Sequence, residues 1–177
     1  MSEYSTEAII LGRRENGPYN RIVDLYTKEL GRVEARVVSG RKIISRLSPH
    51  LDFGNLAHVR LVYKNQFTVA DALTEERFFS GPEDIGVYER FSRLAFLFCS
   101  LAPQMIPDVE VWDMFLRGLR KRGLDYRMFL SLFGYGALHA ECSACARSGS
   151  HAFFVPDQSF LCASCAEMFP KDLLVFL

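Results

Sequence analysis

The sequence predicts a multi-module α+β chain made of a small β-barrel, a helical segment and a four-cysteine metal module. Three observations lead to this fold class. Apolar and polar residues alternate in residues 1–80, helical periodicity replaces the alternation in 81–138, and residues 139–177 hold four of the five cysteines. With 177 residues, the chain is long enough for one ordinary domain or for two to three small modules. We therefore expect three domains with these bounds.

Five short runs in residues 1–80 are typical of β-strands. In one of them, Val33, Ala35 and Val37 alternate with polar residues, as in a half-buried strand. Turn sequences such as ENGPYN, ELGR and KNQ separate the runs. Five short strands favour a closed or nearly closed barrel, because closure removes exposed sheet edges. An SH3-like barrel is the alternative. The runs are residues 7–14, 21–30, 32–40, 55–65 and 66–78.

Residues 81–138 are predicted to form three helices. The first carries one apolar face, made of Val87, Phe91, Leu94, Ala95 and Phe98. Two prolines punctuate its connection to a second helix in VEVWDMFLRGLRKR, and a third short helix ends at Gly134. Cys99 lies within the first apolar face, so we interpret it as a small core residue.

The pattern C-x2-C-x16-C-x2-C predicts one structural zinc ion held by Cys142, Cys145, Cys162 and Cys165. Each CxxC turn presents two sulfurs, and two such turns complete a tetrahedron. HAFFV and SFLC are typical of two short strands that would bring the pairs together, forming a zinc ribbon. A ribbon this small should have almost no core of its own, so the metal would supply much of its folding energy.

Three catalytic alternatives fit the cysteine pattern less well. A redox CxxC needs a thioredoxin-like βαβ unit, which the pattern lacks. A zinc deaminase needs H-x-E followed by P-C-x-x-C, and Leu161 stands where that proline belongs. A catalytic zinc needs an open coordination position, which four thiolates close. His139 and His151 could each replace a thiolate but are not needed. We therefore expect the cysteine module to be structural, which by itself does not say what the protein does.

A basic segment, RVEARVVSGRKIISR, runs from Arg32 to Arg46 with Glu34 as its single acid. Because the formal net charge of the chain is zero, this clustering is a local feature. On a small barrel it could follow a phosphate backbone, with Tyr19 and Tyr26 as candidates for base stacking. The alternative is a solvated strand face without a ligand. The candidate contacts are Arg36, Arg41, Lys42 and Arg46, together with Arg13, Arg14, Arg21 and Arg32.

The N-terminal pattern predicts a cytoplasmic protein. MSEYSTEAII has no basic n-region or long apolar h-region of a signal peptide. The longest apolar run, LAFLFC, is far too short to cross a bilayer, so we expect no membrane partner. In a reducing compartment, the cysteines should be thiols or metal ligands.

Three stretches resemble the RecO family of bacterial DNA repair and recombination mediators. They are EAIILGRRENGPYNRIVDLYTKELGRV, SGRKIISRLSPHLDFGNLAHVRLVYK and LFGYGALHAEC, which precedes the first CxxC pair. The resemblance covers nearly the whole chain, which would be a short member of the family. It implies that the barrel is an OB-fold and that Cys142, Cys145, Cys162 and Cys165 take the zinc.

The resemblance further implies a function without catalysis. RecO-like proteins bind single- and double-stranded DNA, anneal complementary strands, and act with RecR to load RecA onto DNA coated by single-strand-binding protein. The basic residues given above would contact DNA in the bacterial nucleoid. A different class stays open, in which an OB-fold and zinc ribbon bind RNA or dock into a transcription or translation complex.

Overall fold

The computed structural model describes residues 1–38, 46–79, 81–136 and 139–177. The chain forms two compact units, Met1–Gly123 and Leu124–Leu177. The predicted barrel and the first two predicted helices lie in the first unit, and the third helix lies in the second. The division into three domains at residues 80 and 138 stays a prediction. No helix in the part of the chain that the structure describes is long and apolar enough to span a membrane.

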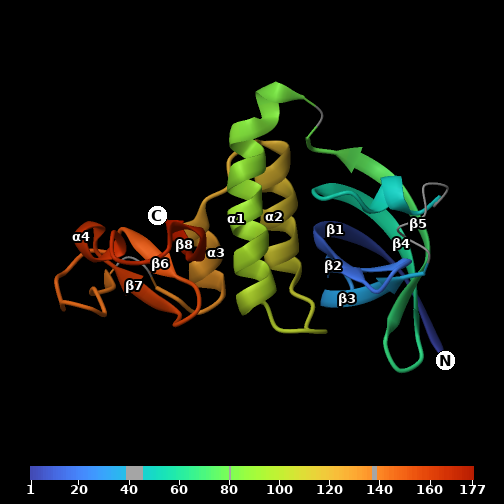
Figure 1. Cartoon of the computed structure of the whole chain (residues 1–177), viewed down its shortest axis with the longest axis horizontal. Helices are drawn as coiled ribbons and strands as arrows, with labels where there is room; N and C mark the ends of the chain where they lie inside the picture. The colour runs from blue at the N-terminus through green and yellow to red at the C-terminus, as the bar shows by residue number, and fades with distance from the viewer. Residues whose placement is uncertain (39–45, 80, 137–138) are drawn as a thin grey trace. The chain divides into compact units, whose positions relative to one another are not determined.

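The five predicted strands form a closed barrel in the order β1-β2-β3-β5-β4 (Figure 1). β3 and β5 pair in parallel, and the other neighbouring strands pair antiparallel. A five-stranded Greek-key barrel of this kind is an OB-fold, as the resemblance implied. The strands are β1 (Ser2–Asn16), β2 (Asn20–Thr27), β3 (Gly31–Val37), β4 (Asn55–Tyr63) and β5 (Phe67–Arg77).

The barrel interior is filled by the alternating apolar residues of these strands. Val33, Ala35 and Val37 are almost fully buried, as their spacing predicts for the inward face of β3. The short 3-10 helix η1 (Ser48–Leu51) contributes Leu51 to the same core. Closure of the strands around one core explains why residues with alternating polarity form a stable small domain.

Two helices pack beside each other against the outside of this barrel (Figure 1). They are α1 (Ile85–Leu101), preceded by the 3-10 helix η2 (Pro82–Asp84), and α2 (Val109–Arg120). The Asp108 side chain accepts hydrogen bonds from two backbone N–H groups in the first turn of α2, which fixes where that helix begins. Tyr26 of β2 contacts Phe98 and Trp112, so aromatic rings join the helices to the barrel.

The α1–α2 connection, residues 102–108, runs along the edge of β3. Met105 N–H donates a 3.0 Å hydrogen bond to the carbonyl of Arg32, and Gln104 forms a parallel bridge with the same residue. Gly31 allows this approach, because a Cβ atom there would lie 2.2 Å from the Ile106 carbonyl oxygen. Its φ of 67° also falls in the left-handed region that favours glycine.

The second unit begins with α3 (Tyr126–Leu132), which the Asp125 side chain caps. A three-stranded sheet follows in the order β7-β6-β8. Its strands are β6 (Ala152–Phe154), β7 (Ser159–Leu161) and β8 (Leu174–Phe176), with α4 (Ala163–Ala166) and the 3-10 helix η4 (Lys171–Leu173) between the last two.

The strand β8 and the core of this unit were not expected from the sequence. β8 pairs with β6 along its full length, so the apolar tail completes the sheet. Ala152, Leu161 and Leu174 pack with the cysteines in a small apolar cluster. The expectation that this module has almost no core is therefore wrong, because it left the tail out of the fold.

Candidate nucleic-acid interface and metal site

The outer face of β1, β2 and β3 carries the polar side chains that alternate with the barrel core. Arg14, Ile22 and Arg36 lie directly opposite one another across the three strands. The next row holds Asp24 and Glu34, also directly opposite. Since side chains of directly opposite residues lie on the same face, each row brings together groups far apart in sequence. In OB-folds the face of strands 2 and 3 is the one that binds oligonucleotides.

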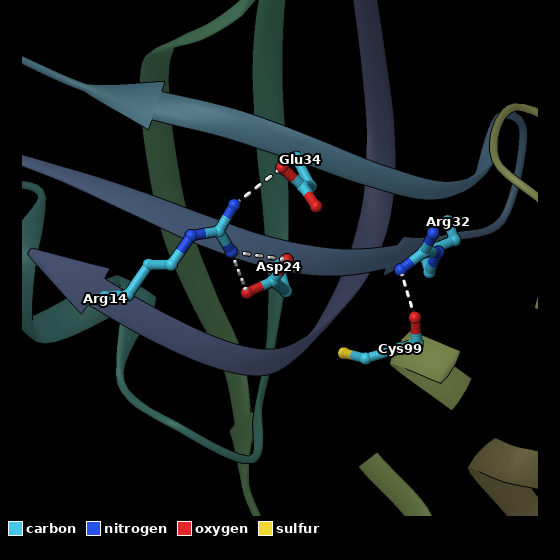
Figure 2. Close-up of polar contacts among 5 residues, drawn as sticks. All are labelled: Arg14, Asp24, Arg32, Glu34 and Cys99. Atoms are coloured by element: carbon cyan, nitrogen blue, oxygen red, sulfur yellow. Dashed lines mark hydrogen bonds and ion pairs between the residues drawn. The ribbon is translucent and has the colours of Figure 1, made fainter. Parts of the chain in front are cut away.

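Arg14 is held between two carboxylates on this face (Figure 2). Its guanidinium donates a 2.8 Å hydrogen bond to Asp24 Oδ2 and a 2.6 Å hydrogen bond to Glu34 Oε2. The sequence had pointed to Glu34 as the only acid of the basic segment and had overlooked Asp24. Alternation along β2 places Asp24 outward with Ile22, and this signal was available in the sequence. The positive charge of Arg14 is thus countered in this structure.

Arg32 and Arg36 lie on the same face and are half-buried. Arg32 donates a hydrogen bond to the backbone carbonyl of Cys99 in α1 (Figure 2). The Nε atoms of both arginines are buried without a hydrogen-bond partner among the described residues. A buried N–H donor without a partner is uncommon in native proteins and indicates a place where a ligand or water can bind.

Arg13 and Arg21 belong to a different surface. They lie opposite the core residues Val23 and Val37, so their side chains continue the inward rows to one end of the barrel. There Arg13 pairs with Asp52, and Arg21 donates a 2.8 Å hydrogen bond to Ser48 Oγ of η1. The single basic face suggested by the sequence is therefore divided into an outer group and a barrel-end group.

The other members of the predicted interface have mixed outcomes. Arg46 is exposed just before η1, and Arg41 and Lys42 lie outside the described residues. Tyr19 is 61% exposed in the β1–β2 connection and can stack on a base. The interpretation of Tyr26 as a stacking residue is wrong, since it is 2% exposed beneath α1 and α2. Tyr26 is buried by contacts with helices more than 70 residues away along the chain, and the alternation within a strand does not predict such contacts.

The four cysteines of the two CxxC pairs come together in the second unit. Their sulfur atoms all lie within 4.8 Å of one another, and Cys145 Sγ is 3.8 Å from Cys162 Sγ. A tetrahedral ion with sulfur ligands at about 2.3 Å requires sulfur–sulfur distances of about 3.8 Å. The cluster can therefore hold one metal ion. His139 and His151 do not belong to it.

The electrostatics of the cluster differ from one sulfur to the next. A hydrogen bond from the backbone of Cys162 lowers the pKa of the Cys142 thiol to about 6. Hydrogen bonds with the thiols of Cys145 and Cys162 raise the pKa of Cys165 to about 12. One thiolate in the cluster makes deprotonation of the other thiols unfavourable, because like charges repel. A bound cation offsets this repulsion and favours the thiolate form of all four sulfurs. Outside the cluster, Cys99 is half-buried in α1, so it lies at the border of the core rather than within it as predicted, and burial raises the pKa of its thiol to about 11.

These features define a class of protein, an OB-fold chain that also carries four clustered cysteines able to hold a metal ion. Residues 1–72 match the family model described as "Recombination protein O N terminal". The similarity to curated relatives extends past this region. The chain is 28% identical to a DNA repair protein RecO of Nocardioides sp., over 92% of this chain and 74% of that protein. It is 29% identical to a DNA repair protein RecO of Dehalococcoides mccartyi, over 60% of this chain and 41% of that protein.

The predicted resemblance to the RecO family is confirmed, since the N-terminal residues match its family model and both relatives are RecO proteins. The family model covers the whole of β1 to β4 and most of β5, so the match falls on the barrel that carries the outer arginines.

Proposed function

We propose that this chain is a DNA-binding recombination mediator of the RecO type. The observation that carries the proposal is the match of its barrel to the RecO N-terminal model, together with arginines on the outer face of β1 and β3. Arginine contacts to phosphates attach a protein to DNA without reading its sequence and leave the base edges free to pair. Such attachment to two strands is what annealing requires.

The proposed DNA contacts form two tiers. Arg36, Arg32 and Arg14 act on the outer face, and Arg14 becomes available as phosphate displaces its carboxylate partners. Arg46, exposed just before η1, is a further proposed contact, and Arg41 and Lys42, outside the described residues, stay predicted contacts. Arg13 and Arg21 act at the barrel end. Contact with about four phosphates would give a log–log salt slope of roughly −3 on single strands.

The four-cysteine site is proposed to hold one zinc ion. The donor set of four thiolates and the 3.8 Å sulfur separation suit tetrahedral zinc. When bound, the ion cross-links the two CxxC turns and supplies folding energy to the second unit. Four sulfurs leave no open position for a substrate, so the proposal contains no catalytic step. The second unit then serves as a scaffold and a docking surface.

The proposed partners follow from the same assignment. The chain would bind single- and double-stranded DNA and act with a RecR-like protein. Through that complex it would help to load RecA on DNA coated by single-strand-binding protein, in the bacterial cytoplasm and nucleoid. The similarity of this chain to two DNA repair proteins supports this role.

Strand annealing tests the proposal. Two complementary oligonucleotides, one with a fluorophore and one with a quencher, should pair faster with the protein than without it at low salt. Arg36→Gln should slow the reaction, because it removes a cation of the outer face. Arg60→Gln is the matched control, since Arg60 lies on β4 and pairs with Glu3 at 2.9 Å. No acceleration by the unmodified protein would refute the annealing function, and preference for RNA over DNA of equal length would favour the RNA-binding class.

A further inference from the structure

A groove of about 230 Å³ opens on the outer face between β3, the β4–β5 turn and the α1–α2 connection. Arg32 and Arg36 line it from β3, and Gln66 and Gln104 line it from the turn and the connection. The groove forms because two different segments pair with the edge of β3 and leave a gap between them. Gln104 pairs beside Arg32, and β5 begins its pairing only at Ala35.

The polar lining of the groove is rich in hydrogen-bond donors. The Nε atoms of Arg32 and Arg36 are buried and have no partner within the described parts of the chain. The bond from Arg32 to the Cys99 carbonyl anchors one of these two guanidinium groups (Figure 2). The amides of Gln66 and Gln104 can donate or accept. A ligand with acceptor atoms along one edge would satisfy these buried donors.

Apart from Glu34, whose carboxylate can accept a hydrogen bond from an N–H group of a ligand, the remaining lining is apolar and suits a flat group. Ile22, Phe67 and Met105 contribute it from β2, β5 and the connection. The volume lies below the range of about 300–1,000 Å³ that is usual for pockets of drug-sized ligands, so the groove has room for a single small ring system. A nucleobase combines a flat apolar face with acceptor atoms on its edge, and guanidinium planes commonly stack on such faces.

We propose that this groove takes one unstacked nucleobase of a bound single strand. The inference rests on the proposed function and deepens it, because the groove lies on the face of strands 2 and 3 that binds the strand. A base in a duplex is paired and stacked, so it cannot enter without being extracted. The groove thereby gives the protein a preference for single strands that phosphate contacts alone do not provide.

Filling the groove tests this inference without changing charge. Ile22 is half-buried on the outer face, so Ile22→Trp should be accommodated there while its indole occupies the space of the base. Binding is measured for an oligothymidine strand and for a strand of the same length built from abasic sites. The ratio of their affinities isolates the bases, since both strands carry the same phosphates. We expect this ratio to fall by roughly five- to fifty-fold in the variant.

Controls separate this inference from the proposed function. Leu73→Trp adds an indole at an exposed position on β5 outside the groove lining and should leave the ratio unchanged. The double variant Gln66→Ala, Gln104→Ala removes two amides that could bond the base, so it should also lower the ratio of the two affinities. An unchanged ratio in Ile22→Trp overturns the inference while DNA binding persists. An equal loss on both strands means that the groove holds a phosphate and overturns the base assignment. If the unmodified protein binds neither strand, the proposed function itself fails.

Discussion

Releasing Arg14 from its carboxylate partners should strengthen DNA binding. In Glu34→Gln, the 2.6 Å bond between Arg14 Nη2 and Glu34 Oε2 loses its ionic character, and one negative charge leaves the interface. A phosphate that takes Arg14 no longer has to compete with this carboxylate. The perturbation therefore increases the positive charge offered to DNA without adding any residue that could create a new contact.

The structure sets the size of the effect. The Arg14 and Glu34 side chains are 50% and 40% exposed, so solvent screens their interaction. Exposed ion pairs contribute about 0.2–1 kcal/mol, which corresponds to an affinity gain of roughly 1.4- to 5-fold when the competition ends. If Arg14 then contacts one more phosphate, the log–log salt slope should become more negative by about 0.7. Asp24 still holds the other side of the guanidinium, so Asp24→Asn added to Glu34→Gln should extend both changes.

Fluorescence anisotropy with a labelled oligothymidine strand, titrated over a series of salt concentrations, measures both quantities. Glu3→Gln is the matched control, because it makes the same charge change and releases Arg60 from a pair with 50% and 49% exposed side chains. If Glu3→Gln increases affinity and slope as much as Glu34→Gln does, the gain reflects net charge alone. The specific role of the Arg14 pair is then refuted, as it also is if Glu34→Gln changes neither quantity.

Three further predictions concern the fold and the cysteines. Cys142→Ser should abolish zinc binding, measured by metal analysis, and should expose the second unit to hydrogen exchange. DNA affinity should stay within about twofold, because the barrel has its own core. A folded variant that has lost DNA binding would contradict this division between the two units. Gly31→Ala should destabilise the first unit by about 2–4 kcal/mol in denaturant unfolding, since its Cβ would overlap the Ile106 carbonyl. Gly17 has a φ of 73° and open space around it, so Gly17→Ala should lower the free energy of unfolding by only about 1 kcal/mol. Equal costs would show that the contact with the connection does not matter. Burial raises the pKa of the Cys99 thiol to about 11 and keeps it protonated at pH 8.5. Alkylation of Cys99, followed by mass spectrometry of its peptide, should therefore be about 100-fold slower than for an exposed thiol and accelerate as the pH approaches 11. Rapid alkylation of Cys99 itself in the folded protein at pH 8.5 would refute this.

The sequence by itself determined the parts of this protein that depend on local patterns. Alternation located all five barrel strands, and helical periodicity located α1 and its buried face of Phe91, Leu94 and Phe98. The CxxC spacing identified the four sulfurs that meet in one cluster. These signals are readable because a strand or helix repeats its side-chain direction every few residues, and because a tight turn fixes the distance between two cysteines.

Only the tertiary structure decided which of these residues share a surface. It separated Arg13 and Arg21 from the outer arginines, set Asp24 against Arg14, and buried Tyr26 beneath two helices. It also brought Gln104 to the edge of β3, which creates the groove. Strand register and long-range packing fix these neighbours, and both depend on the joint burial of many residues rather than on the pattern within one segment.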